Sequence, residues 1–241
     1  MPPRGDGGAL TADLEARRRA VELIGCAAAL LFANGQTTER TVQAVERLGR
    51  ALGVSVTLLP RWDVLTLEIG EGVQSRSLSL ASAPTGVDMG KVAIVLALIE
   101  QLCDGRLGAE AAAAALDQVK HAPPTSTIRF AIMAAAGAMA LGVIFGAVHL
   151  LSLALIGISA GLGGWLRRAL GRFSRNPFLQ PFSAALLAGL LGAATAQLQL
   201  SSLQRLIAVC PCMVLVPGPH LLNGAIDLVR ARIALGAARM A

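Results

Sequence analysis

The second half of the chain contains four long stretches with almost no charged residue, and these restrict the fold more than any other feature. They cover residues 130–148, 149–166, 178–200 and 206–229, and the only formal charge inside them is Asp227. About 20 apolar residues in a helix are enough to cross the hydrocarbon core of a bilayer. Buried helices of a soluble protein would need polar faces toward water, which these stretches barely supply. We therefore predict an all-α transmembrane bundle of four spans in residues 126–241.

Charge is divided unevenly between the two halves. Residues 1–120 contain twelve Lys or Arg and fourteen Asp or Glu, whereas residues 121–241 contain nine Arg and one acidic residue, Asp227. The first half is therefore charged like a soluble domain, and it is long enough to bury its own core. The net charge of +6 would suit nucleic acid, but the arginines lie at the ends of apolar stretches and the chain has no Tyr for base stacking. We exclude nucleic acid as a partner and expect a lipid bilayer.

The first half is predicted to be a small α+β domain in residues 11–125, preceded by a disordered segment, residues 1–10. Capping residues, β-branched runs and Gly or Pro breaks mark four helices and a three-stranded meander. The helices are expected at 11–33 (capped by Thr11), 38–52 (capped by Thr37 or Thr38), 88–103 (capped by Asp88) and 109–120, and the strands at 54–59, 62–69 and 77–80. The fold class is therefore mixed, with this α+β domain followed by the transmembrane bundle.

The α+β domain lacks the residues that most enzyme sites need. No His precedes His121, so neither a Ser-His-Asp nor a Cys-His arrangement can form inside it. Glycine motifs for phosphate or dinucleotide binding are absent from the sequence, and the four Cys lack the spacing of a metal or disulfide framework. We predict a protein that is not an enzyme and needs no metal and no cofactor. Arg17–Arg19 is read as an exposed helix face, with contact to anionic lipid head groups as the alternative.

The arginines predict how the spans are oriented. Four of them lie between the second and third spans and three follow the fourth: Arg167, Arg168, Arg172, Arg175, Arg230, Arg232 and Arg239. The link before the second span and the link at residues 197–204 carry no charge. Positive loops stay on the cytoplasmic side of a membrane. We therefore expect a multi-pass protein of a bacterial inner membrane with its N-terminal domain in the cytoplasm, which agrees with the lack of a signal peptide.

The fourth span is predicted to be broken. Pro217, Gly218 and Pro219 remove backbone donors and loosen the chain, and a helix restarting near Pro219 would point its positive end into the gap. That end suits a carboxylate. His220, Asn223 and Asp227 follow at i, i+3 and i+7, so they share one face of the restarted helix.

Ionisable groups and irregular backbone at membrane depth mark solute or proton paths. The predicted transport path therefore consists of Pro217, Gly218, Pro219, His220, Asn223 and Asp227. Two plainer interpretations stay open. Asp227 would instead pair with Arg230 at the membrane surface, and His220 would be a buried, hydrogen-bonded histidine.

Small residues recur at four-residue spacing in the first two spans. Gly142 and Gly146 lie in the first, and Gly157 and Gly161 lie in the second. In lipid this spacing permits close helix packing, which we expect inside the bundle. A homo-oligomer or a solute path are the alternatives.

Three segments resemble motifs of one family. Residues 34–42, NGQTTERTV, are similar to its G-x-E-T-x-R-V-E region after the first helix, displaced in detail, and residues 47–54 continue it. Residues 85–92, TGVDMGKV, resemble its segment before the third helix. Residues 215–228, LVPGPHLLNGAIDL, are the most specific and match its L-x-P-G-x-x-x-x-N-x-x-x-D-x stretch. On these residues the chain resembles, nearly end to end, the threonine/serine exporter family, including its two-component members.

The resemblance also implies what is missing. Members of the family continue into a fifth span, whereas this chain stops at Ala241 after the start of another apolar segment. We therefore expect either a truncated fifth span or a protein that lacks this span. Full-length members carry a second membrane half. The resemblance therefore implies a separate partner subunit of four or five spans.

The expected function is a subunit of an inner-membrane secondary transporter that exports small carboxylate-bearing metabolites. The resemblance implies threonine and serine, or a dicarboxylate such as succinate for the split members. Proton coupling is expected because no nucleotide-binding motif is present, with Asn223 binding the solute and Asp227 carrying the proton or orienting the site. The alternative is a membrane-anchored regulatory or scaffold protein whose cytoplasmic domain binds a partner. A membrane-tethered hydrolase is disfavoured because the first half lacks a nucleophile arrangement.

Overall fold

The first two helices form a hairpin whose ends follow local capping rules. The structure, a computed structural model, describes residues 6–70, 75–84, 86–173, 179–197, 204–215 and 218–240. Helix α1 (Asp6–Ala33) stops before Gly35, whose φ of +94° only glycine adopts readily, and α2 (Thr38–Ala51) begins after Thr37, whose side chain accepts a hydrogen bond from the Arg40 amide. This stop and this cap confirm the prediction.

The predicted start of the first helix is wrong. α1 begins at Asp6 rather than at Thr11, so residues 6–10 are helical and not disordered. Ala9 and Leu10 are strong helix formers, but Gly7 and Gly8 are poor ones, so local propensity does not explain the earlier start. Residues 1–5 lie outside the described residues.

The sheet is the predicted antiparallel meander. Strands β1 (Val56–Pro60), β2 (Val64–Ile69) and β3 (Arg76–Ala81) pair in the order β1-β2-β3, with Leu58 opposite Leu67 and Leu67 opposite Leu78. Alternate residues of β1 and β2 are buried, as a sheet with one covered face requires. The turn at 71–74 lies outside the described residues.

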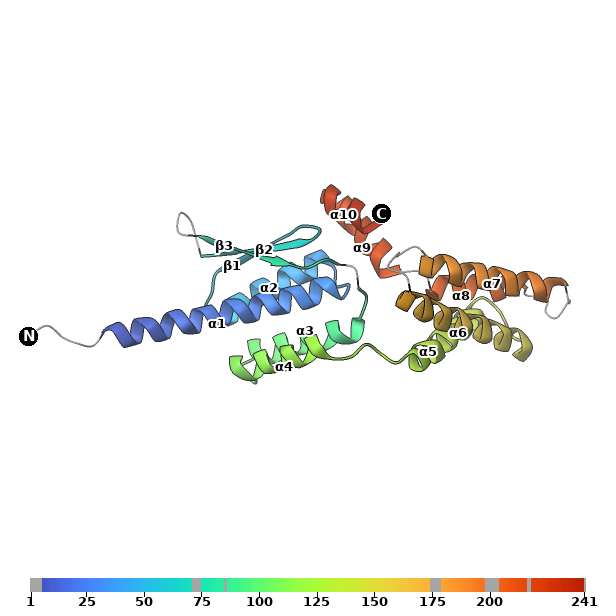
Figure 1. The fold of residues 1–241 in the computed structure, drawn as a ribbon, viewed down its shortest axis with the longest axis horizontal. Coiled ribbons are helices and arrows are strands. Elements are labelled where there is room, and N and C mark those ends of the chain that lie inside the picture. The colour runs from blue at the N-terminus through green and yellow to red at the C-terminus, as the bar shows by residue number, and fades with distance from the viewer. Residues whose placement is uncertain are drawn as a thin grey trace, which may run out of the picture. The chain divides into compact units, whose positions relative to one another are not determined.

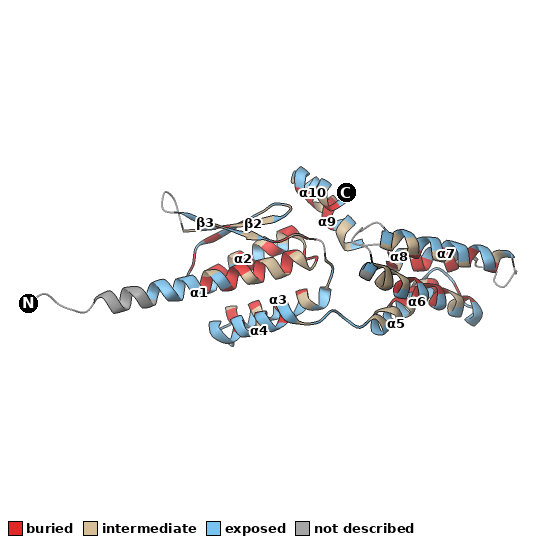
Figure 2. Cartoon of the chain, in the orientation of Figure 1, coloured by how far each residue is buried: buried red, intermediate tan, exposed pale blue. Residues whose placement is uncertain are grey.

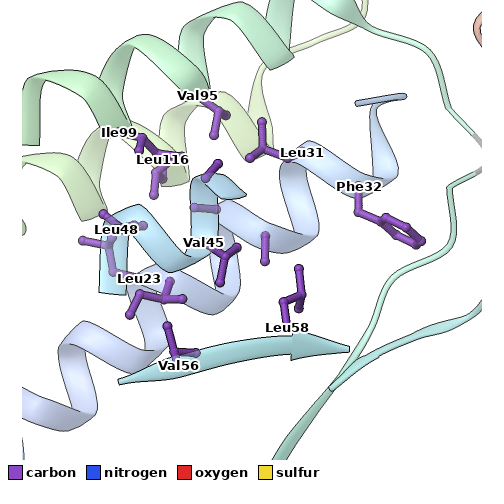
Figure 3. Close-up of a cluster of buried hydrophobic side chains, with 14 of the residues drawn as sticks. Leu23, Leu31, Phe32, Val45, Leu48, Val56, Leu58, Val95, Ile99 and Leu116 are labelled. Atoms are coloured by element: carbon purple, nitrogen blue, oxygen red, sulfur yellow. The ribbon is translucent and has the colours of Figure 1, made fainter. Parts of the chain in front are cut away.

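Two further helices complete a layered domain. α3 (Met89–Cys103) is capped by Asp88, as predicted, and is followed by α4 (Ala109–His121). The sheet lies on one side of α1 and α2, and α3 and α4 lie on the other (Figure 1). The core fills the space between these layers, and Figure 3 shows part of it, with Leu23, Leu31, Leu48 and Val95 among its labelled side chains.

The C-terminal helices belong to the same compact unit. The chain up to Ala122 packs together with Pro219–Ala241, and Pro123–Gly218 forms a second unit. Helices α9 (Gly218–Val229) and α10 (Ile233–Met240) cross so closely at Gly224 and Gly236 that a Cβ on Gly236 would lie 2.8 Å from the Gly224 carbonyl oxygen. Leu235 of α10 is part of the apolar core of the α+β domain. This differs from the expected division, in which everything after residue 125 belonged to the membrane bundle.

A tight turn joins α9 to α10. Ala231 has a φ of +59°, its amide donates to the Leu228 carbonyl, and the Arg232 amide donates to the Asp227 carbonyl at 2.8 Å. These bonds form the Schellman pattern that ends many helices, usually with glycine at the position that Ala231 occupies. The turn sends α10 back along α9, so this apolar segment packs on the first unit.

In the residues that the structure describes, the second unit is a bundle of four helices. They are α5 (Thr127–Ile144), α6 (Leu150–Phe173), α7 (Leu179–Gln197) and α8 (Gln204–Leu215). α5 ends four residues before the predicted boundary at 148, because Gly146 takes a φ of +90° and closes a Schellman turn. α6 continues past the predicted end at 166, because arginine ends an apolar stretch but is a good helix former.

Three of these helices, α5, α6 and α7, are long and apolar enough to cross a membrane. α8 and α9 pass the same test only as a pair, so a fourth span exists if the two make one broken span. Large apolar side chains are exposed on the outside of the bundle, among them Ile132, Phe182 and Leu190. Figure 2 shows many exposed residues along its helices. Such a surface suits lipid rather than water.

The glycines of the first two spans pack inside the bundle. A Cβ on Gly142 would lie 2.8 Å from Ile156, and a Cβ on Gly157 would lie 2.9 Å from the Met139 sulfur, so α5 and α6 meet at these positions. The intra-bundle interpretation is confirmed for Gly142 and Gly157. Gly146 forms the turn after α5 and is not a packing residue.

The end of α8 is capped by a neighbouring helix of the same unit. Arg167 of α6 donates from Nη1 to the carbonyl oxygen of Leu215, the last residue of α8, at 2.6 Å. A cation at a helix C-terminus satisfies an orphan carbonyl and the helix dipole together. Residues 216 and 217 follow and lie outside the described residues.

Candidate functional site

α9 presents its polar face to protein and its apolar face outward. Asn223, Gly224 and Asp227 are buried, whereas Leu222 and Val229 are mostly exposed. A helix on the surface of a water-soluble domain has the opposite arrangement. Buried polar groups behind an exposed apolar face are typical of a helix in contact with lipid.

Asp227 is buried against the N-terminus of α2. Its side chain is 1 % exposed, and Oδ2 accepts a hydrogen bond from the Thr38 hydroxyl at 2.9 Å. Thr38 is the first residue of α2, so the carboxylate lies at the positive end of a helix 14 residues long. The other carboxylate oxygen, Oδ1, has no hydrogen-bond partner among the described residues.

Two arginines supply the opposite charge. Arg239 of α10 places Nε 3.2 Å from Asp227 Oδ2, and Arg232 places Nη1 3.5 Å from Oδ1. Neither nitrogen is aligned for a hydrogen bond to the carboxylate, so both act through charge. Arg239 also donates from Nη2 to the Thr38 hydroxyl oxygen at 3.2 Å and stacks over the Phe32 ring at 5.2 Å.

Burial changes the acid–base properties of Arg239. The loss of water around its guanidinium lowers its pKa from the ordinary value, and the neighbouring Asp227 partly offsets this effect. The guanidinium remains a buried cation that needs a counter-charge, and Asp227 supplies it.

A second ion pair lies closer to the surface. Glu39 of α2 binds Arg230 at 2.5 Å and lies 3.7 Å from Arg232. The proposed pairing of Asp227 with Arg230 is therefore wrong, because Arg230 turns toward Glu39 while Asp227 pairs with Arg232 and Arg239. The cluster contains three arginines and two carboxylates, which leaves one positive charge in excess.

Asn223 fixes α9 to the loop that precedes α2. Its side-chain amide donates to the Gly35 carbonyl at 2.9 Å, and both groups are buried. Gly35 has little space around it, since a Cβ there would lie 3.3 Å from the Gly86 carbonyl oxygen. Asn223, Asp227 and Arg230 thus contact three residues of one short segment, Gly35, Thr38 and Glu39.

The predicted path residues fall into two groups. Asn223 and Asp227 share one buried site, and His220 lies one turn earlier on α9, half-buried. Gly218 and Pro219 are the first residues of α9, which confirms that a helix restarts there, and Gly218 has open space around its Cα. Pro217 lies outside the described residues.

Sequence reasoning missed Thr38, Arg239, Gly35 and Glu39 as parts of the site. The signal that could have found three of them was the segment 34–42, which resembles a family motif just as residues 215–228 do. The structure brings these two segments, 188 residues apart at Gly35 and Asn223, into contact. Arg239 had no motif to mark it.

The first unit also contains a cavity away from this cluster. It has a volume of about 1180 Å³ and is lined by α1, α4, the segment before β1 and Gly70 after β2, with Arg17, Cys26, Leu116 and Lys120 in its lining. None of the predicted path residues that the structure describes lines it. Within the described residues, no three His, Cys, Asp or Glu side chains come together in a way that could hold a metal ion.

Comparison with known families agrees with the motifs. The family model ThrE, described as "Putative threonine/serine exporter", matches residues 22–241 and so covers the α+β domain from within α1 onward, the apolar helices and the Asp227 cluster. No curated protein and no solved structure matched the chain in such comparisons. The match spans most of the chain, so the chain belongs to the ThrE family of putative threonine/serine exporters.

Proposed function

We propose that this protein is a subunit of a proton-coupled exporter of small carboxylate-bearing metabolites in a bacterial inner membrane. The candidate solutes are threonine, serine and a dicarboxylate such as succinate. The observation that supports this most directly is α9, which buries Asn223 and Asp227 and exposes an apolar face. In a membrane protein, an ionisable group kept buried behind an apolar face is costly and is usually retained for transport of an ion or solute.

The cluster has the chemistry that such a transporter needs. Asp227 can exchange a proton, and Asn223 lies one turn before it on the same buried face. The excess positive charge around Asp227 favours an anionic group such as the carboxylate of the solute. The helix restart at Gly218 and Pro219 would place free backbone amides beside the path.

The orientation follows from the same residues. Arg230, Arg232 and Arg239 follow the apolar part of α9, so the positive-inside rule assigns this end to the cytoplasm. Asp227 at that end contacts Thr38 of the α+β domain. A cytoplasmic α+β domain is consistent with the positions of these arginines and with the contact between Asp227 and Thr38.

Metabolite efflux tests the proposal. Bacterial cells with the chain, alone and together with a candidate partner subunit of four or five spans, would be loaded with threonine, serine or succinate. Release into the medium would then be measured over a range of external pH. We expect release to depend on the chain and on pH. Asp227→Asn should remove the pH dependence, whereas Asp117→Asn should not, because Asp117 is an exposed carboxylate on α4.

The outcomes separate the two classes of function. If Asp227→Asn exports each solute as the wild type does at every pH, the proton-coupling role of Asp227 is wrong. If no solute is released with any partner, the regulatory or scaffold alternative gains support. Joint replacement of Pro217 and Gly218 by Ala tests the broken helix in the same assay, and unchanged export would contradict its role.

A further inference from the structure

Thr38 occupies a position between the two buried charges of the cluster. Its side chain is buried, and its hydroxyl donates to Asp227 Oδ2 at 2.9 Å while accepting from Arg239 Nη2 at 3.2 Å. A hydroxyl has one proton to donate and lone pairs to accept with. Because the guanidinium can only donate, it fixes the direction of the chain of bonds from Arg239 through Thr38 to Asp227.

The two oxygens of Asp227 are therefore not equivalent. Oδ2 is held by the Thr38 hydroxyl, whereas Oδ1 has no hydrogen-bond partner among the described residues. The charged groups around the carboxylate are Arg239 on α10 and Arg232 in the α9–α10 turn, with Glu39 and Arg230 behind Arg232. Both arginines stabilise only the ionised carboxylate.

Thr38 is different because its contact survives a change of charge. If a proton from water binds Oδ1, Oδ2 becomes the carbonyl oxygen of a neutral acid and still accepts from the Thr38 hydroxyl. The attraction to Arg232 and Arg239 is lost in that state. Among these neighbours, Thr38 is thus the one whose bond to the carboxyl group holds in both protonation states.

We propose that Thr38 is a positioning residue that holds Asp227 by Oδ2, leaves Oδ1 as the atom that takes the coupling proton, and so makes the α+β domain part of the coupling device. This inference rests on the proposed function, in which Asp227 exchanges a proton. It extends the site from the membrane helix to the N-terminus of α2.

The test measures the pH dependence of export in variants of the hydroxyl. Cells with the full chain and its partner are loaded with threonine, serine or succinate, and the pH of half-maximal export is determined. Thr38→Val removes a donor to the ionised carboxylate, so the midpoint should move to higher pH by about one unit, a tenfold change in proton binding. Thr38→Ser keeps the hydroxyl and should keep the wild-type midpoint.

Matched variants distinguish the effect of the Thr38 hydrogen bond from the effect of side-chain packing. Thr41→Val removes another buried hydroxyl one turn along α2, which donates to the Thr37 carbonyl, and should leave the midpoint unchanged. Thr38→Cys retains most of the volume with a weaker donor and should give an intermediate shift. It also replaces Thr38→Val if melting of the purified protein shows that the valine variant does not fold.

Each outcome decides between explanations. An unchanged midpoint in Thr38→Val and Thr38→Cys, while Asp227→Asn has lost its pH dependence, overturns the inference and leaves the proposed function intact. Equal shifts in Thr38→Ser and Thr38→Val also overturn it, because the hydroxyl is then not responsible. If Asp227→Asn retains the wild-type pH dependence, the proton role of Asp227 in the proposed function fails first and the role of Thr38 fails with it.

Discussion

Replacement of Asp227 by Asn is expected to destabilise the first unit by much more than removal of a typical surface charge. The side chains of Asp227 and Arg239 are 1 % and 0 % exposed, so water can neither screen nor replace their attraction. The asparagine side chain would keep the acceptor for Thr38 but leave the Arg239 guanidinium buried without its carboxylate. Breaking a buried pair on one side costs about 3–5 kcal/mol.

Replacement of Arg239 should lower the free energy of unfolding by less than Asp227→Asn does, and replacement of both residues should recover part of the lost stability. Arg239→Met keeps an unbranched stem over Phe32, and Asp227 retains Thr38 and Arg232, so we expect a loss of roughly 1–3 kcal/mol. In Asp227→Asn/Arg239→Met no unpaired charge remains at this position. The double variant should be at least as stable as Asp227→Asn alone, and the two losses should therefore not add.

The assay is thermal unfolding of the purified full-length protein in detergent, followed by circular dichroism. For a chain of this size 1 kcal/mol corresponds to about 2–4 °C, so Asp227→Asn should lower the melting temperature by roughly 10 °C. Glu39→Gln is the matched control, because Glu39 and Arg230 are 33 % and 51 % exposed, and such pairs contribute at most about 1 kcal/mol. Strictly additive losses in the double variant, or equal effects of Asp227→Asn and Glu39→Gln, would refute the assignment of a buried charge pair.

Three further predictions concern single positions. Gly236→Ala should lower the melting temperature, because its Cβ would meet backbone atoms of α9 at 2.8 Å, whereas Gly189→Ala, with nothing within 4 Å, should be neutral or stabilising. Ala231→Gly should stabilise the protein by about 1 kcal/mol, since Ala231 has a φ of +59°, and a loss in the same melting experiment would contradict this. Burial raises the pKa of the Cys26 thiol, with Lys120 opposing, so less thiolate is present at any given pH. Alkylation of Cys26 at about pH 8, near the pKa of a free thiol, followed by mass spectrometry, should be slower than that of free cysteine, and an equal rate would count against burial.

The elements of the α+β domain could be predicted from sequence because their signals are local. Thr37 and Asp88 cap their helices through bonds to residues three positions away, and Gly35 ends α1 through its own backbone conformation. The alternating strands predicted the meander in its observed order. The start of α1 was misplaced because Thr11 is a good cap in isolation, whereas the helix extends back through Gly7 and Gly8, which helix propensity disfavours.

The apolar stretches predicted the helices of the second unit but not their ends. Hydropathy reports where a segment can enter lipid, whereas a helix ends where its backbone hydrogen bonds end. α6 therefore continues through Arg167 and Arg168, and α5 stops at the Gly146 turn while the sequence is still apolar. The number of spans depends on whether α8 and α9 together form one broken span, and composition alone does not determine this.

Only the α9 residues of the site could be predicted from the sequence. Asp227 and Asn223 could be predicted because an isolated acid and an amide on one helical face are visible in the sequence. Their partners could not, because contacts over 188 residues leave no periodic signal. The position of Arg239 depends further on a turn in which Ala231 adopts a backbone conformation usually taken by glycine. The apolar residues after that turn were therefore read as the start of another span. An apolar segment such as residues 233–240, with its single arginine at Arg239, fits both a membrane span and a short helix folded back over a buried carboxylate, and its composition does not distinguish the two.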